Sequence, residues 1–143
     1  MTSTTILKRT LFLTSLYGLI LAATPPLRAV DRMAAGQWEF TMTTDGAAHS
    51  ASHCITPAEA TSVNGDSKTG RDYAEKKATG PCKVKSYNIQ GNTVSYFLAC
   101  GDRSIDSTQT YHGDSSDGVL KITTADGKVV TTTVKARRLG ACP

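Results

Sequence analysis

One segment bounded by two cysteines constrains the fold of this chain most strongly. Residues 82–100 read CKVKSYNIQ, then Gly91-Asn92, then TVSYFLAC. Two runs of alternating side chains around a Gly-Asn pair predict a β-hairpin. With a three-residue loop at residues 90–92, Cys82 lies opposite Cys100, at the Cα separation of roughly 4.5 to 5.5 Å that a disulfide can bridge. We therefore expect a disulfide-linked hairpin.

The same register assigns the hairpin side chains to two faces. One face carries both cysteines together with Val84, Val94, Tyr96 and Leu98. The other face is partly polar, but it includes Tyr87, Ile89 and Phe97, which would form an apolar patch among lysines. A two-residue loop would mix lysines with Tyr96 and Leu98, so the pattern favours the longer loop. The patch is a candidate binding surface, unless another part of the chain covers it.

The start of the chain has the layout of a secretory signal peptide. Lys8 and Arg9 precede an apolar run at residues 11–23. A run of about 13 residues is shorter than the roughly 20 that cross a bilayer as a helix. An uncleaved membrane anchor is the alternative, but Pro25 and Pro26 follow the run at once. We therefore predict export without a stable membrane span after cleavage.

Cleavage after Ala23 and cleavage after Ala29 both fit the pattern. We treat residues 1–29 as signal peptide and leader and residues 30–143 as one domain, which is periplasmic or secreted. Three of the 16 basic residues leave with the leader, so 13 basic residues remain against 12 acidic ones. Because no clustered basic face is visible, we do not expect a nucleic-acid partner.

Four cysteines in an exported chain predict two disulfides. They are Cys54, Cys82, Cys100 and Cys142. Three pairings are possible, and the hairpin register favours Cys82 with Cys100, which leaves Cys54 with Cys142. No C-x-x-C spacing occurs, which argues against a thioredoxin-like redox role. We interpret the cysteines as structural.

The rest of the domain reads mainly as β-strands. Alternation or turn signals mark strands at residues 36–44, 48–55, 103–112, 119–124 and 128–137, in addition to the hairpin. Thr56, Pro57 and Glu59 form a capping-box pattern, which predicts one short helix that ends by Val63. We expect an antiparallel meander of about seven strands, forming a curved open sheet or a small barrel.

The segment 64–80 is polar and contains three glycines. Its composition favours a long, mobile surface loop, and such loops are often functional or disordered. A brief helix at residues 72–78 is the alternative, because Asp72 and Lys76 have the spacing of an i,i+4 ion pair.

Several landmarks together resemble a known family. Gly36-Gln37-Trp38-Glu39 opens the domain, Cys54-Ile55-Thr56-Pro57 precedes the polar segment, and residues 137–142 read RRLGAC. This arrangement is similar to a family of small exported bacterial proteins catalogued as a domain of unknown function. The resemblance implies a periplasmic or secreted, disulfide-containing β-rich domain, and it implies no activity, substrate or catalytic residue.

The sequence offers little catalytic chemistry. His49, His53 and Cys54 have a conceivable metal-ligand spacing, but a disulfide at Cys54 would remove one ligand and a site needs three or four. No G-x-S-x-G, H-E-x-x-H or Gly-rich phosphate loop occurs. We expect no metal, no cofactor and no enzyme activity.

Two functional hypotheses follow. The first is a non-enzymatic exported domain that binds a small apolar ligand or an envelope protein. The second is a cell-envelope enzyme or enzyme inhibitor that acts through the 64–80 loop. An apolar pocket with convergent polar groups would favour ligand binding, whereas a rigid protruding loop would favour inhibition.

Overall fold

The structure is a computed structural model that describes residues 31–143. The predicted signal peptide and both candidate cleavage points lie outside the described residues. Within residues 31–143, neither helix is long and apolar enough to cross a membrane.

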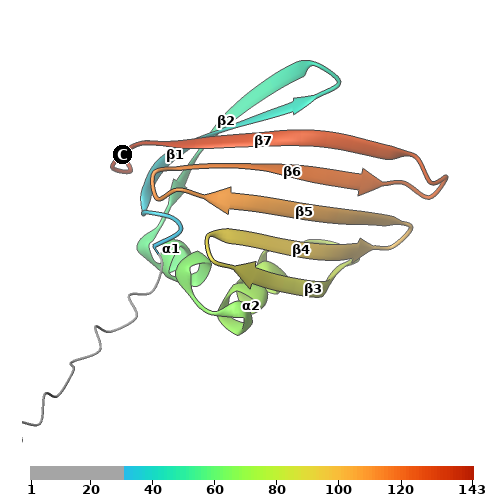
Figure 1. The fold of residues 1–143 in the computed structure, drawn as a ribbon, viewed down its shortest axis with the longest axis horizontal. Helices are drawn as coiled ribbons and strands as arrows, with labels where there is room; N and C mark the ends of the chain where they lie inside the picture. The colour runs from blue at the N-terminus through green and yellow to red at the C-terminus, as the bar shows by residue number, and fades with distance from the viewer. Residues whose placement is uncertain (1–30) are drawn as a thin grey trace, which may run out of the picture.

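Seven strands and two helices make up this part of the chain (Figure 1). In chain order they are β1 (Gly36–Thr44), β2 (Ala47–Ile55), α1 (Pro57–Asn64), α2 (Ser67–Lys77), β3 (Cys82–Gln90), β4 (Thr93–Cys100), β5 (Arg103–Tyr111), β6 (Ser115–Thr123) and β7 (Val129–Gly140). The strands form one antiparallel sheet in the order β2-β1-β7-β6-β5-β4-β3. Since β2 and β3 are the two edges, the sheet is open and the barrel alternative is wrong.

The two faces of the sheet differ in character. We call the face on which α1 and α2 lie the helix-side face. On β4 to β7, alternate residues on this face are mainly apolar, whereas the opposite face carries threonines and charges such as Asp106, Lys121 and Lys135. This alternation is typical of an antiparallel sheet with one face in water.

The core lies where α1 covers the start of β1. Trp38 is fully buried, and its indole nitrogen donates to the Ala34 carbonyl at 2.9 Å. Packed around it are Met33, Ile55, Ala60 and Ala136. Thr56 caps α1 and forms the predicted capping box with Glu59. The capping-box pattern therefore correctly placed the start of this helix.

The four cysteines form two pairs at disulfide distance. Cys82 pairs with Cys100 and Cys54 with Cys142, with Cα separations of 3.9 and 5.5 Å. These are the pairs that the hairpin register favours. The first bond joins two adjacent strands, and the second attaches the end of the chain to β2.

The hairpin turn differs from the prediction. Gln90 lies opposite Thr93, so the loop has two residues, and Ile89 faces Val94. An irregularity between Val84 and Ser86 inserts one extra residue and restores the register that joins the cysteines. A β-bulge of this kind reverses which face the following side chains occupy. Both features were missed because the alternation pattern alone does not locate a bulge.

The segment 64–80 also differs from the predicted loop, because residues 67–77 form helix α2. Asp66 caps it by accepting a hydrogen bond from the Thr69 amide at 2.7 Å. Asp72 pairs with Lys68 at 2.7 Å, one turn before the expected partner Lys76. The loop prediction is wrong because a capping aspartate and helix-surface ion pairs stabilise a segment with few apolar residues.

Candidate functional site

A cavity of about 290 Å³ lies between α2 and the helix-side face of the sheet. Ala74 and Ala78 line it from the helix, and Val94 and Leu98 line it from β4. The volume is near the lower end of the roughly 300 to 1,000 Å³ of small-molecule sites. The cavity can therefore hold a small apolar molecule.

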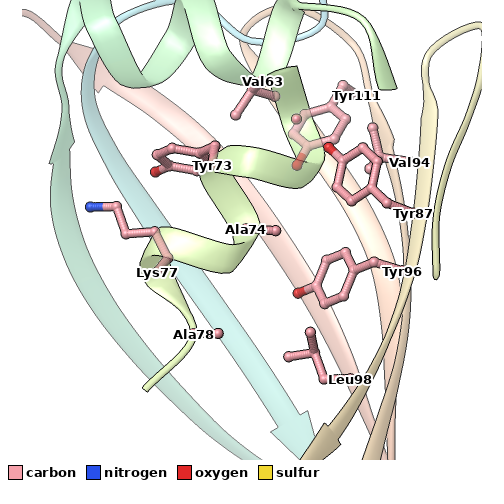
Figure 2. Close-up of a pocket in the computed structure, with 11 residues that line it drawn as sticks. Val63, Tyr73, Ala74, Lys77, Ala78, Tyr87, Val94, Tyr96, Leu98 and Tyr111 are labelled. Carbon is pink, nitrogen blue, oxygen red and sulfur yellow. The ribbon is translucent and has the colours of Figure 1, made fainter. Parts of the chain in front are cut away.

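Tyrosines dominate the wall of this cavity. The lining includes Tyr73, Tyr87, Tyr96 and Tyr111, which are all the tyrosines among residues 31–143. Figure 2 shows the rings of Tyr87, Tyr96 and Tyr111 extending from the strands toward α2. The Tyr87 and Tyr96 rings are nearly parallel, with centroids 6.3 Å apart. We call this space the tyrosine cavity.

The bulge in β3 brings Tyr87 to the tyrosine cavity. Because the bulge moves the side chains that follow Val84 to the other face, Tyr87 lies opposite Tyr96. On the helix side, Gly70 is buried against the ring of Tyr87. A bulge on one side and a glycine on the other thus allow the ring to lie between sheet and helix.

The four phenol groups have different hydrogen-bonding states. The Tyr73 hydroxyl lies 3.4 Å from the Glu59 carboxylate, and in Figure 2 it points away from the other three rings. Within residues 31–143 the hydroxyls of Tyr87, Tyr96 and Tyr111 have no protein hydrogen-bond partner, and no buried polar side-chain atom is left unsatisfied. These three hydroxyls are therefore accessible to a ligand.

Burial raises the pKa of Tyr73 and also changes the acidity of two of the three unpartnered phenols. It raises the pKa of the Tyr87 phenol, and it raises the pKa of Tyr111 more strongly. Both groups are consequently protonated at neutral pH, because even an unperturbed tyrosine titrates near pH 10. A protonated phenol can donate a hydrogen bond to an oxygen of a bound molecule.

A buried positive charge lies near the same tyrosines. Arg32 is 5% exposed, and its guanidinium donates to the carbonyls of Val63 (2.9 Å), Gly91 (3.3 Å) and Gly65. It forms no salt bridge with residues 31–143. Its positive charge opposes the rise in the pKa of Tyr111. Arg32 thus places a positive charge near Tyr87 and Tyr111, and no carboxylate among residues 31–143 forms an ion pair with it.

Glu59 attaches α2 to α1 beside the cavity. Its carboxylate accepts hydrogen bonds from Lys77 at 2.8 Å and from the Thr56 amide at 3.0 Å. These contacts lower the pKa of Glu59 to about 2, the Lys77 contact most strongly. Figure 2 shows the Lys77 ammonium pointing away from the cavity, so Lys77 contributes its alkyl stem to the lining.

The predicted binding surface is divided by the bulge. Tyr87 and Ile89 lie on the helix-side face, and Tyr87 lines the cavity, while Phe97 lies on the opposite face across from Ser86 and Asp106. The three residues do not form one patch. Sequence reasoning missed Tyr73 as a site residue. Tyr96 and Tyr111 were aromatic candidates for a binding surface, but alternation favoured the core for Tyr96.

His49 and His53 are both on β2, and neither lines the tyrosine cavity. Cys54 is in a disulfide, and the His53 ring is 4.0 Å from the Glu59 carboxylate. Among the described residues, no group of three or more His, Cys, Asp or Glu side chains could hold a metal ion.

The fold and the cavity define a small, disulfide-linked β-sheet protein with two helices and a tyrosine-lined cavity on one face. Residues 33–142 match the model of a family described as protein of unknown function (DUF3617), and the chain belongs to that family. The expected membership in a family of unknown function is confirmed. No curated protein and no solved structure matches the chain.

Proposed function

We propose that this protein is a non-enzymatic, exported binding protein whose tyrosine cavity takes a small apolar molecule with a hydrogen-bond-accepting oxygen, such as a carboxylate. The observation that carries the proposal is that one cavity is lined by three tyrosines, Tyr87, Tyr96 and Tyr111, whose hydroxyls have no protein partner among residues 31–143. Aromatic walls contact the apolar body of the ligand, and the hydroxyls donate to its oxygen.

Charge supports an anionic ligand over a cationic one. The Arg32 guanidinium is buried near the tyrosines, and its partners among residues 31–143 are all carbonyls. A buried charge is energetically costly unless an opposite charge compensates it. A carboxylate in the cavity would supply part of that compensation, whereas an ammonium group would be repelled.

Export is supported by the cysteines. Two structural disulfides are typical of proteins in an oxidising compartment. Together with the signal-peptide pattern of residues 1–29, this supports a periplasmic or secreted protein.

The alternative hypothesis, an envelope inhibitor that inserts the 64–80 segment into a target, has less support. This segment is α2, which packs against β3 and α1. Inhibition through it would require α2 to leave the sheet and open the tyrosine cavity.

An NMR titration of the ¹⁵N-labelled domain tests the proposal. The probes are 2-naphthoate, which has an aromatic body and a carboxylate, and 2-naphthylmethylamine, which has a cation instead. We expect saturable shifts with naphthoate for amides around the cavity and much weaker binding of the amine. The double variant Tyr87→Phe, Tyr96→Phe removes only two hydroxyls and should weaken naphthoate binding about tenfold or more.

A cavity-filling variant provides the matched control. Ala74→Leu places a larger side chain in the cavity and should abolish naphthoate binding, while Lys76→Leu on the exposed surface of α2 should not. Fluorescence of Trp38, the only tryptophan, reports that each variant is folded. Equal binding to the wild type and Ala74→Leu would overturn the proposal.

A further inference from the structure

The helix-side face continues beyond the tyrosine cavity as a row of aliphatic side chains. Leu98 on β4 lies opposite Ile105 on β5, which lies opposite Ile122 on β6, which lies opposite Val130 on β7. We call these four residues the aliphatic row. Leu98 also lines the cavity, so the row and the cavity are continuous.

Each member of the aliphatic row is only half-buried. The reason is the position of the helices, because α2 packs mainly against β3, at the edge of the sheet. Figure 1 shows both helices close to β3 and the start of β1, while the long middle strands extend past them. The row therefore leaves the cavity and crosses a part of the sheet that is open to solvent.

The aliphatic row lies on an uncharged face of strands whose opposite face is charged. On the helix-side face, residues 105–111 of β5 and 116–122 of β6 contribute no Asp, Glu, Lys or Arg. The opposite face of these strands carries Asp106, Asp117 and Lys121. The need for solubility explains why the opposite face is charged. It does not explain why an apolar row is left uncovered on the helix-side face.

The dimensions of the row fit a narrow, extended occupant. Four neighbouring strands span three spacings, which is roughly 14 Å perpendicular to the strands. A second copy of the chain would need roughly 800 Å² on each partner for a stable interface. Even with Leu120, Val134 and Met42, which lie on the same face, the side chains of this part of the sheet offer less than that area. A single alkyl chain, in contrast, contacts one row of side chains along its length.

We propose that the ligand of this protein is an amphipathic lipid with one alkyl chain, such as a fatty acid, whose head lies in the tyrosine cavity and whose chain lies along the aliphatic row. This inference rests on the proposed function, because it takes the cavity as the site of the polar group. The Tyr87, Tyr96 and Tyr111 hydroxyls hold the head, and Leu98, Ile105 and Ile122 contact successive parts of the chain.

The test is a series of straight-chain carboxylates titrated into the wild-type domain below their micelle concentrations. The probes are hexanoate, octanoate, decanoate and dodecanoate, with 2-naphthoate as the probe for the cavity alone. We expect the Kd to fall about twofold per added methylene, because the open row covers only about half of each methylene group. Ile105→Thr and Ile122→Thr should each reduce this dependence on chain length.

Matched controls separate the two proposals. Val119→Thr changes the same strand as Ile122 on the opposite face and should leave the whole series unchanged. Naphthoate binding should be unaffected by Ile105→Thr and Ile122→Thr. If naphthoate binds but affinity does not depend on chain length, the lipid inference is wrong and the cavity proposal stands. If neither probe binds, both are wrong.

A competing occupant gives a different result. If Ile122→Thr changes the oligomeric state in analytical ultracentrifugation and leaves alkanoate binding unchanged, the row is an interface between copies, and the lipid inference is overturned.

Discussion

Gly70 on α2 lies directly against the phenol ring of Tyr87 on β3. A methyl group at Gly70 would come within 2.7 Å of Cε1 and Cζ of that ring, closer than van der Waals contact permits. In most helix interiors, Gly→Ala stabilises by about 1 kcal/mol. Here we expect Gly70→Ala to destabilise the domain by about 1 to 3 kcal/mol instead, as overpacking does. Urea unfolding followed by Trp38 fluorescence measures this difference.

Lys76→Ala is the control for Gly70→Ala, because Lys76 is exposed on the same helix. Its effect should stay within about 0.5 kcal/mol. Gly70→Ala should also weaken naphthoate binding, since a displaced Tyr87 ring changes the shape of the tyrosine cavity. A Gly70→Ala variant that is as stable as the wild type and binds equally well would show that this contact does not position the ring.

The sequence predicted the architecture better than the site. Alternation and turn residues predict the strands because a half-buried antiparallel strand imposes a period of two on its own side chains. The Cys82–Cys100 pair was predicted correctly although the two-residue turn and the bulge were both missed, because their effects on the register cancel, and Cys54–Cys142 was the pair that remained. Local chemistry also placed the cap of α1 at Thr56, since a capping box involves residues only three positions apart.

The tyrosine cavity was not predictable in this way. Tyr73, Tyr87 and Tyr111 come from α2, β3 and β5, and only the packing of the helix on the sheet brings them together. The bulge near Lys85 changes the face of Tyr87, and a bulge adds one residue without a distinct sequence signal. Only the second half of α2 was anticipated, as the alternative helix at residues 72–78, because its stability comes from Asp66 and surface ion pairs and not from an apolar stripe.

The Glu59 carboxylate should make the stability of the domain sensitive to acid. Its pKa is lowered to about 2 in the folded state, chiefly by the hydrogen bond from Lys77, against a usual value of 4.5. A group with a lowered folded-state pKa contributes its stability above the unfolded-state pKa and loses it as the pH falls toward the folded-state value. The contribution should therefore be complete above about pH 5 and decline between pH 4.5 and 2.

Glu59→Gln measures this contribution. The shift corresponds to roughly 3 kcal/mol. Because the partner Lys77 is 57% exposed, solvent screening lowers the expected loss at pH 7 to about 1 to 2 kcal/mol. The difference between wild type and variant should shrink on acidification to pH 3. Glu75→Gln, which removes an exposed pair with Arg71, should cost less than about 0.5 kcal/mol. A Glu59→Gln loss that is constant from pH 7 to pH 3 would contradict the linkage.

Arg32 should be among the most important residues for stability. Its guanidinium joins the segment before β1 to the last turn of α1 and to the β3–β4 turn through carbonyls of Val63, Gly65 and Gly91. Carbonyls at a helix C-terminus also favour a nearby cation. Arg32→Met should therefore cost about 3 kcal/mol or more. The exposed Arg103→Met is the control and should change the free energy of unfolding by less than about 0.5 kcal/mol. Similar losses from both variants would mean that the carbonyl contacts of Arg32 contribute little.

The two disulfides should differ in what they contribute. The bond between Cys82 and Cys100 closes a loop of 18 residues, and the bond between Cys54 and Cys142 closes one of 88. A cross-link restricts the unfolded chain more when the loop is longer, and chain entropy gives about 3 kcal/mol for the shorter loop and about 4.6 kcal/mol for the longer one. Removing the Cys54–Cys142 bond should therefore be the more damaging change.

Double alanine variants of each pair, compared by urea unfolding with Trp38 as the probe, test this ranking without leaving a free thiol. A single Cys82→Ser variant should also be strongly destabilised, because it breaks the same bond as Cys82→Ala, Cys100→Ala. Each pair lies near one end of two paired strands. Cys82 is directly opposite Cys100 on β3 and β4, and Cys54 on β2 is opposite Gln37 on β1. Cys100 is buried, whereas Cys54 and Cys142 are half-buried, so the Cys82–Cys100 variant also loses more local packing. A larger loss of stability in the Cys54–Cys142 variant would therefore show that loop length dominates. An unchanged melting temperature in either double variant would mean that the remaining sheet contacts already restrict the chain as much as the cross-link does.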